Sequence, residues 1–277
     1  MANQTTQRFL ANKNAKFDSF DLALEDIYQY GCEFEFYIKK TLDFQATVLE
    51  IKDKILQFSN ADILLDFVSL PSDVDKNQCI QIKPDHSLED NGIEISVPIT
   101  SKNGIKHYIN NILKIIQEYG YTNDDTGLHF HISTIKNDGV NFDFYLYMLM
   151  CHDKDLFSSW ATRNGYSHNV MDILSGNSKI ASRNIKNHKG QIWNLEKISS
   201  NHVEIKSMGG IDYHLKKDQI ILEFEQYAEC FDIIHKKKNT KYREQLINNH
   251  KKIIENISVT QKEEFINIIY ELGIIDE

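Results

Sequence analysis

The sequence lacks the features that mark disulfide-rich, zinc-ribbon and membrane proteins. Its four cysteines lie far apart and form no CxxC pair, which excludes a zinc ribbon and a dense disulfide scaffold. No run approaches the roughly 18 consecutive apolar residues of a membrane-spanning helix. The first residues, MANQTTQRFLANKNAKF, contain no hydrophobic segment of the signal-peptide type. We therefore expect a soluble cytoplasmic protein without membrane contacts.

The chain is also short of positive charge. Its formal net charge is -9, with 31 basic and 40 acidic residues. An acidic protein repels polyphosphate chains at long range, which argues against a general nucleic-acid-binding role. The hydrophobic fraction of 41% is ordinary for a globular protein of 277 residues. An excess of carboxylates does suit a protein that binds metal ions.

The pattern along the chain predicts alternating strands and helices. We expect a flexible N-terminal arm over 1–20, a catalytic domain over 21–239 and a C-terminal helical segment over 240–277 packed on it. Only three prolines occur, and there is no obvious linker or internal repeat. Strands are predicted over 31–38, 63–69, 79–83, 92–97, 127–133 and 202–208, and helices over 44–58, 104–120, 141–157 and from 218 onward. The second of these helices ends at Gly120, interpreted as a C′ glycine, and 161–200 has the composition of long loops.

Three of the predicted strands each carry two ionisable residues on one face. Residues two apart in a strand point the same way, and the intervening residues here are apolar. The pairs are Glu33 and Glu35, His129 and His131, and Glu204 and Lys206. Any one strand could simply have a solvated face, where polar and apolar residues alternate as a matter of course. Three such strands together contain the side chains of a site for metal and phosphate.

A further strand adds a fourth carboxylate to this set. Glu94 lies between Ile93 and Ile95 in the segment GIEISVP. If these strands are neighbours, carboxylates and imidazoles converge on one face, where the carboxylates repel one another. Divalent cations relieve that repulsion, and magnesium brings a polyphosphate with it.

The ordered motifs resemble those of the amidoligases, in the superfamily of glutamine synthetase and glutamate–cysteine ligase. The family shows a GxExE strand, a DxSL turn before an EhxSP strand, and a GxHxH strand. The corresponding segments here are Gly31-Cys32-Glu33-Phe34-Glu35, Asp85-His86-Ser87-Leu88, Glu94-Ile95-Ser96-Val97-Pro98 and Gly127-Leu128-His129-Phe130-His131. The resemblance covers about residues 31–230. It implies an α+β fold in which a curved, mainly antiparallel sheet has the active site on its concave face and helices on its convex face.

The resemblance also implies roles for individual residues. Magnesium or manganese ions would be held by Glu33, Glu35, Glu94, His129 and Glu204. ATP phosphates would lie beside His131 and Ser133, and Lys206 would contact the substrate carboxylate or the transferring phosphate. An arginine from the loop after the histidine strand would help to neutralise the phosphates; the candidates are Arg163, slightly preferred, and Arg183.

Two departures from the family pattern affect the substrate side of the site. The family usually has arginine at the position of Lys206, and lysine keeps the charge but loses the planar bidentate fork. Ser96-Val97-Pro98 replaces the more usual Ser-Pro step.

The activity implied is an ATP-dependent carboxylate–amine ligation through an acyl phosphate, with magnesium or manganese. Its substrates would be a carboxylate and an amine that belong to small molecules, peptides or macromolecules, and a homo-oligomer is compatible with the sequence. Two alternatives stay open. One is a metal-dependent hydrolase that uses the same histidines and glutamates, and the other is a non-enzymatic binding protein whose polar sheet face is solvated.

Two other features are interpreted as structural. Glu223 and Glu225 repeat the ExE spelling, but the surrounding apolar residues follow helical spacing, which separates the two side chains. His214 has no partner at ligand spacing and is expected on the surface or in a loop.

Overall fold

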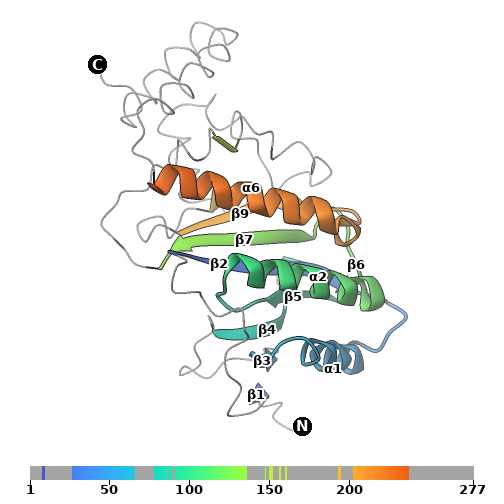
Figure 1. Ribbon diagram of the computed structural model, residues 1–277. Helices are drawn as coiled ribbons and strands as arrows, with labels where there is room; N and C mark the ends of the chain where they lie inside the picture. Colours follow the sequence, from blue (N-terminus) through green and yellow to red (C-terminus); the bar gives the residue numbers. More distant parts are fainter. Residues whose placement is uncertain are drawn as a thin grey trace, which may run out of the picture.

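Strand β2 (Tyr28–Ile38) lies in the middle of one open sheet in this computed structural model. The structure describes residues 8–9, 27–65, 78–85, 87–88, 91–135, 147, 150–151, 156, 160, 193–194 and 202–236. Figure 1 shows this strand with other strands of the sheet on both of its sides. Its two main neighbours are β5 (Gly92–Ser96), which pairs with the second half of β2, and β7 (Gly127–Thr134), which pairs with the first half.

The sheet has nine strands in the order β1-β3-β4-β5-β2-β7-β9-β8, with β6 beside β2. The other strands are β1 (Arg8–Phe9), β3 (Asp62–Leu65), β4 (Cys79–Pro84), β5 (Gly92–Ser96), β6 (Gly120–Tyr121), β7 (Gly127–Thr134), β8 (Trp193–Asn194) and β9 (His202–Gly209). The pairing of β3 with β4 is parallel, and every other pairing is antiparallel. The prediction of a mainly antiparallel sheet is confirmed; its curvature stays a prediction.

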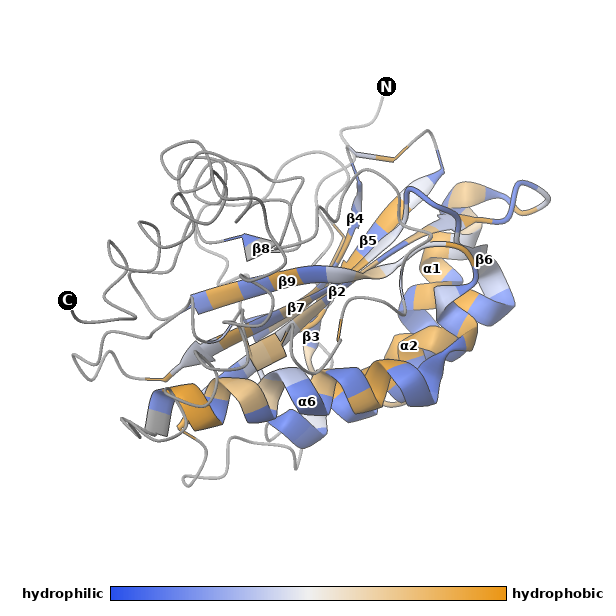
Figure 2. Ribbon diagram, turned by 90° about the horizontal axis from the view of Figure 1, so that it is seen from above, coloured by the Kyte–Doolittle hydropathy of each residue, from blue (hydrophilic) through white to orange (hydrophobic). Residues whose placement is uncertain are grey.

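Three α-helices belong to the described part of the chain. They are α1 (Phe44–Ile55), α2 (Lys102–Tyr119) and α6 (Lys217–Lys236). The side chains of Asp43 and Ser101 cap the first two by accepting hydrogen bonds from backbone N–H groups of the first turn. Figure 2 shows α2 and α6 lying along one face of the sheet. None of the described helices combines the length and the apolar character needed to cross a lipid bilayer.

Aromatic packing joins the helical layer to the sheet. The ring of Phe224 in α6 lies 5.5 Å from that of Tyr30 in β2 and 4.9 Å from that of Phe130 in β7, centroid to centroid. Phe34 and Phe36 of β2 are completely buried in the same core. Because side chains alternate along a strand, this packing leaves the even-numbered residues of β2 in the core and the odd-numbered ones on the opposite face.

The helix ending at Gly120 differs from the sequence-based interpretation. Helix α2 ends at Tyr119, and Gly120 has φ -125° and ψ -176°, which is extended and not left-handed. A Cβ atom at this position would come within 2.5 Å of the Phe36 ring and 2.9 Å of the carbonyl oxygen of Tyr37. Glycine is therefore required by the close approach of the chain to β2, where it begins β6.

Two other predictions meet the structure only in part. The residues expected to form loops over 161–200 include the short strand β8, which pairs with β9. Within the helix expected over 141–157, the described side chains of Tyr147, Met150, Cys151 and Leu156 are buried. The C-terminal segment 240–277 and all of the arm over 1–20 except β1 lie outside the described residues.

Candidate functional site

The polar face of the sheet brings the predicted pairs into register across four strands. Glu33 of β2 lies opposite His129 of β7. His131 of β7 lies opposite Glu204 of β9. On the other side of β2, Glu35 lies opposite Glu94 of β5. Directly opposed residues on antiparallel strands have neighbouring side chains, so residues from four separate segments form one continuous group.

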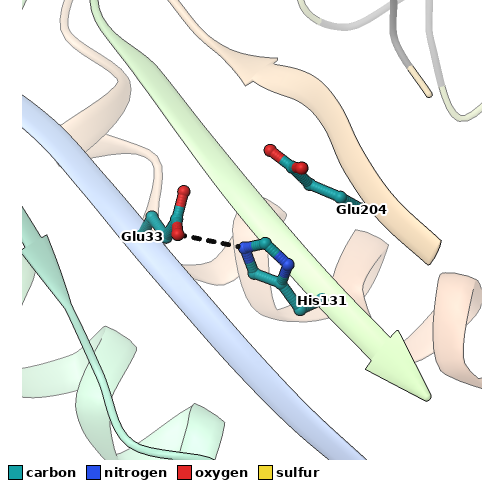
Figure 3. A group of neighbouring side chains, drawn as sticks. All are labelled: Glu33, His131 and Glu204. Atoms are coloured by element: carbon teal, nitrogen blue, oxygen red, sulfur yellow. Dashed lines mark ion pairs between the residues drawn. The ribbon is translucent and has the colours of Figure 1, made fainter. Parts of the chain in front are cut away.

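Glu33, His131 and Glu204 form the tightest part of this group. One donor atom from each of the three lies within 4.8 Å of the other two. The side chains converge from β2, β7 and β9, as Figure 3 shows, and Nε2 of His131 lies 3.3 Å from Oε1 of Glu33. All three residues are half-buried, so the cluster is reachable from solvent and yet shielded from bulk water.

This donor set fits a divalent cation. Donor atoms that each lie about 2.1 Å from one ion are no more than about 4.2 Å from one another. To bind one ion together, the three donor atoms would therefore need to move closer to one another by less than about 1 Å. Two carboxylates with one imidazole suit magnesium less than manganese or zinc, because the imidazole is a borderline donor. The resemblance implied that His129 binds the metal and that His131 lies beside the phosphates, and both roles stay predictions; the distances bring His131 into the three-residue cluster.

His129 lies between the carboxylates on the deeper side of the site. Its Nδ1 is 3.2 Å from Oε2 of Glu33 and 3.7 Å from Oε1 of Glu204, and its Nε2 is 3.3 Å from Oε1 of Glu35. A neutral imidazole has one N–H to donate, and only the protonated ring donates from both nitrogens. His129 is therefore placed either to donate hydrogen bonds to two glutamates or, as a neutral ring, to bind a cation through the nitrogen that carries no hydrogen.

The two outermost carboxylates are each held by a lysine and a neutral donor. Oε1 of Glu94 lies 2.9 Å from Nζ of Lys83 and accepts a hydrogen bond from Ser96. Glu204 lies 3.0 Å from Nζ of Lys206 and accepts a hydrogen bond of 2.7 Å from the amide of Asn194. Positive charge thus flanks the acidic group on both sides.

Strand β9 contains a β-bulge beside Lys206. Leu128 pairs with Met208 and Phe130 with Ile205, so β9 contributes one more residue than β7 over this interval. Ser207 faces the helices as Ile205 does, and its hydroxyl lies 2.8 Å from that of Tyr227 in α6. The extra residue brings the next side chain, Met208, into the core as well, opposite Leu128. Lys206 stays on the polar face beside Glu204.

Burial distinguishes this face from a solvated one. The exposed fractions are 5% for Glu35, 8% for Glu94 and 5% for His129. Charged side chains are rarely buried to this degree unless they are paired or bind a metal. Glu35 also accepts a 2.6 Å hydrogen bond from the backbone N–H of Gly127, which fixes one of its oxygens.

The histidines keep two of the central carboxylates ionised. Burial by itself would raise the pKa of Glu33, but hydrogen bonds and charge from His129 and His131 outweigh it and hold that pKa well below its ordinary value. Burial likewise opposes ionisation of Glu204, whose pKa is nevertheless lowered by His131, His129 and Lys206. Ionised carboxylates are the form that binds cations.

Glu94 behaves differently from these two carboxylates. Burial, followed by the nearby charge of Glu33, raises its pKa, although Lys83 and Ser96 oppose that shift. Burial would lower the pKa of Lys83, but the charge and hydrogen bond of Glu94, together with the charges of Glu33 and Asp85, outweigh burial and raise that pKa.

His202 is a residue of this face to which the sequence analysis gave no role. Its Nε2 lies 3.2 Å from Nδ1 of His131. When Nε2 of His131 binds a cation, the ring hydrogen is on Nδ1, and His202 is the acceptor placed to orient it. The alternation His202, Glu204, Lys206 along β9 could have revealed this residue, because the three share a face.

Lys83 and Asn194 were also missed, for a different reason. Each meets its carboxylate across a strand pair, β4 with β5 and β8 with β9. The local sequence does not determine which strands will be neighbours in the sheet.

The remaining predicted residues divide between described and undescribed parts of the chain. Ser133 lies in β7 on the same face as His129 and His131, opposite His202. Arg163 and Arg183 lie outside the described residues.

The interpretation of Glu223 and Glu225 as structural agrees with the fold. Glu223 is buried in α6 and accepts a hydrogen bond from the indole of Trp160, while Glu225 pairs with Lys106 at 2.8 Å. His214, expected at the surface or in a loop, is instead buried in the 3-10 turn Tyr213–Leu215, within 2.9 Å of the hydroxyl of Thr122.

Comparison with solved structures gives distant similarities, one of which is to a glutamine synthetase. No protein-family model matches the chain, and neither does any curated protein. The cryo-EM structure of Plasmodium falciparum glutamine synthetase matches over 75% of this chain, with a TM-score of 0.36 and 13% sequence identity. The match covers 52% of that chain, so this chain spans about half of its length. The similarity is too low to place the chain in a family.

Proposed function

We propose that the chain is an ATP-dependent carboxylate–amine ligase, an amidoligase that forms an amide bond through an acyl phosphate. The observation that carries the proposal is the convergence of Glu33, His131 and Glu204 within 4.8 Å, with Lys206 bound to the last of them. A site with this composition holds a cation and still presents a positive side chain to an anion. The ordered strand motifs of the sequence support the same chemistry.

The reaction proceeds in two steps that balance in atoms and charge. A carboxylate oxygen attacks the γ-phosphorus of ATP, which gives an acyl phosphate and ADP. An amine then attacks the acyl carbon, phosphate leaves, and the amine nitrogen loses a proton to a base. Activation is needed because oxide is too poor a leaving group for direct attack on a carboxylate.

The residues of this chain contribute positioning and charge to those steps. A bound divalent cation supplies positive charge against the phosphate oxygens. Glu33, His131 and Glu204 would hold that cation, and His202 would keep His131 in the ligating tautomer. Lys206, only 13% exposed, keeps an ammonium beside the cluster, where it can oppose the charge of a transferring phosphoryl group.

A second function deserves a test because the site is rich in imidazole. His129, His131 and His202 all lie within 3.2 Å of another residue of the group. Imidazole ligands favour zinc or manganese, and a metal-bound hydroxide would make the site a hydrolase that requires no nucleotide.

Calorimetry of nucleotide and metal binding separates the two functions. The wild type is titrated with ATP in the presence of Mg²⁺ or Mn²⁺, beside Glu33→Gln, Glu204→Gln and the matched control Glu225→Gln. The control removes a glutamate that is paired with a lysine on the helical side of the sheet. A ligase binds metal and nucleotide together, and the two site variants lose that binding while the control retains it.

The alternative outcomes have defined meanings. Metal binding without any response to ATP favours the hydrolase. Binding of neither ligand leaves a non-enzymatic protein. Where metal-dependent ATP binding occurs, pairs of carboxylates and amines are screened for ADP release that requires both partners.

A further inference from the structure

Tyr213 belongs to the 3-10 turn before α6, yet its hydroxyl reaches the main chain of a glutamate of the polar face. The hydroxyl donates a 2.8 Å hydrogen bond to the carbonyl oxygen of Glu35 in β2. The exposed fractions of the two residues are 0% and 5%, so water does not compete for this bond. The tyrosine therefore ties the turn to the strand that carries Glu33 and Glu35.

The carbonyl of Glu35 lies where the pairing of β2 with β7 ends. That pairing stops one residue before Glu35, although the register would next place Glu35 opposite Gly127. The carbonyl of Cys32 accepts from Val97 on the β5 side, so the carbonyl of Glu35, three residues later, faces the β7 side. In a continued ladder the N–H of Gly127 would donate to this carbonyl. It donates instead to Oε2 of the Glu35 side chain, at 2.6 Å.

Two donors thus divide the two kinds of acceptor that Glu35 offers. The hydroxyl of Tyr213 bonds the main-chain carbonyl, and the N–H of Gly127 bonds the carboxylate. A hydrogen bond to an ionised carboxylate is shorter and stronger than one to a neutral carbonyl, so the N–H holds Oε2 firmly. Without the hydroxyl, the carbonyl and the carboxylate would compete for the same N–H.

The chain between β9 and α6 brings Tyr213 to this place. Gly209, Gly210 and Asp212 have φ values of 137°, 86° and 56°, and glycine adopts such positive φ values without strain. The N–H of Gly210 donates a 2.8 Å hydrogen bond to the carbonyl of Thr126, next to the start of β7. The same connection therefore holds the tyrosine and the first residue of β7 in their relative positions.

We propose that Tyr213 is a positioning residue for the Glu35 carboxylate: its hydroxyl takes the main-chain carbonyl and leaves the N–H of Gly127 to orient the side chain toward His129. The effect on cation binding rests on the proposed metal-dependent function. The orientation of the carboxylate does not depend on that function.

The oriented carboxylate acts on the cation site through His129. Oε1 of Glu35 lies 3.3 Å from Nε2 of His129, while Nδ1 of the same ring lies 3.2 Å from Oε2 of Glu33. A neutral imidazole that donates from Nε2 carries its lone pair on Nδ1. Glu35 thus directs the free lone pair toward the cluster, as carboxylates beside metal-binding histidines do.

The first test measures Mn²⁺ affinity by electron paramagnetic resonance, without nucleotide, since the signal of free Mn²⁺ falls as ions bind. Tyr213→Phe removes the hydroxyl and keeps the ring. We expect its Mn²⁺ affinity to be about tenfold lower than that of the wild type, because loss of an outer hydrogen bond around a metal site weakens binding by about 10–100-fold.

Tyr147→Phe is the matched control. Tyr147 is also completely buried, and its hydroxyl donates 3.2 Å to the carbonyl of Tyr227 in α6, away from the polar face. The control therefore loses the same kind of hydrogen bond, from a tyrosine to a main-chain carbonyl. It should bind Mn²⁺ as the wild type does.

Glu35→Gln separates positioning of the carboxylate from a general structural effect. The substitution keeps the shape of the side chain and removes its charge. In this background Tyr213→Phe has no carboxylate to release, so it should change the Mn²⁺ affinity by less than about twofold. A tenfold effect that persists in the Glu35→Gln background would overturn the proposal.

A second measurement needs no metal. The amide proton of Gly127 is followed by nuclear magnetic resonance in isotope-labelled protein, because a short hydrogen bond to a carboxylate shifts such a proton downfield. Tyr213→Phe and Glu35→Gln should both move this resonance upfield, and Tyr147→Phe should leave it in place. The same spectra show whether each variant is folded.

The failure of this inference is distinguishable from failure of the proposed function. A wild type that binds Mn²⁺ and a Tyr213→Phe variant with the same affinity overturn the role of Tyr213 alone. So does a Gly127 resonance that Tyr213→Phe leaves unmoved. Absence of Mn²⁺ binding in the wild type overturns the metal-dependent function, while the Gly127 resonance still decides whether Tyr213 orients Glu35.

Discussion

Substitution of Gly120 by alanine provides the sharpest test of the packing beside the central strand. The added methyl would lie 2.5 Å from Cδ2 of Phe36 and 2.9 Å from the carbonyl oxygen of Tyr37. The backbone oxygen cannot move without disturbing β2, and Phe36 is completely buried. Since φ is -125° at this glycine, alanine adopts the backbone conformation freely, and the whole penalty comes from overpacking.

The expected cost follows from two opposing terms. Overpacking a rigid core position lowers the free energy of unfolding by about 1–3 kcal/mol. Alanine also restricts the unfolded chain more than glycine does, which raises the free energy of unfolding by about 0.4–1 kcal/mol. We expect Gly120→Ala to lower the free energy of unfolding by about 1–2 kcal/mol, measured by urea denaturation. The thermal midpoint should fall by roughly 2–8 °C.

Gly31→Ala is the matched control for this experiment. Its methyl would meet nothing closer than Cβ of His131 at 3.4 Å, an ordinary contact. The same chemical change should therefore leave stability unchanged or raise it by up to about 1 kcal/mol. Equal effects of the two substitutions would refute the close approach of Gly120 to β2.

Three further predictions concern two hydrogen bonds and one titration. Tyr213→Phe removes the hydroxyl that donates 2.8 Å to the carbonyl of Glu35 and should lower the free energy of unfolding by about 1–2 kcal/mol; a change below about 0.3 kcal/mol would contradict the bond. Ser101→Ala removes the N-cap of α2 and should cost about 1 kcal/mol in the same assay, whereas an unchanged midpoint would mean that the cap contributes nothing. Burial lowers the pKa of His214 below its ordinary value of 6.5, outweighing the opposite effect of Asp212. As pH falls, His214 is therefore protonated in the unfolded chain before it is protonated in the folded one. The free energy of unfolding decreases as pH drops through 6.5 toward the lower native pKa, and His214 does not affect it above pH 6.5. His214→Gln should flatten urea denaturation midpoints between about pH 7 and pH 5; an unaltered slope would exclude this histidine as the cause.

The alternation of side chains made much of the site predictable from sequence. Period-two patterns identified strands β2, β7 and β9 and the face on which Glu33, His129 and Glu204 lie. This information is local, because the geometry of a strand alone determines which residues point the same way. Helices α1, α2 and α6 were predictable for the same reason, from apolar residues at helical spacing.

The partners of these residues were not predictable, because strand pairing is not a local property. The contact of Lys83 with Glu94 requires β4 beside β5, and that of Asn194 with Glu204 requires β8 beside β9. The position of His131 between Glu33 and Glu204 likewise depends on the register of three strands. Gly120 was misread for a related reason, since the ring that it must avoid belongs to a distant segment.

The central position of β2 has a consequence for the order of folding. This strand is made early but is flanked by β5 and β7, and Glu33 meets its histidine partner 96 residues later in the chain. Contacts at such separation close slowly, because a long loop must be ordered before they form. On the ribosome the glutamates of β2 therefore emerge well before the strands that carry their partners. The cluster of Glu33, His131 and Glu204 is complete only after β9 has been synthesised and has joined β2 and β7.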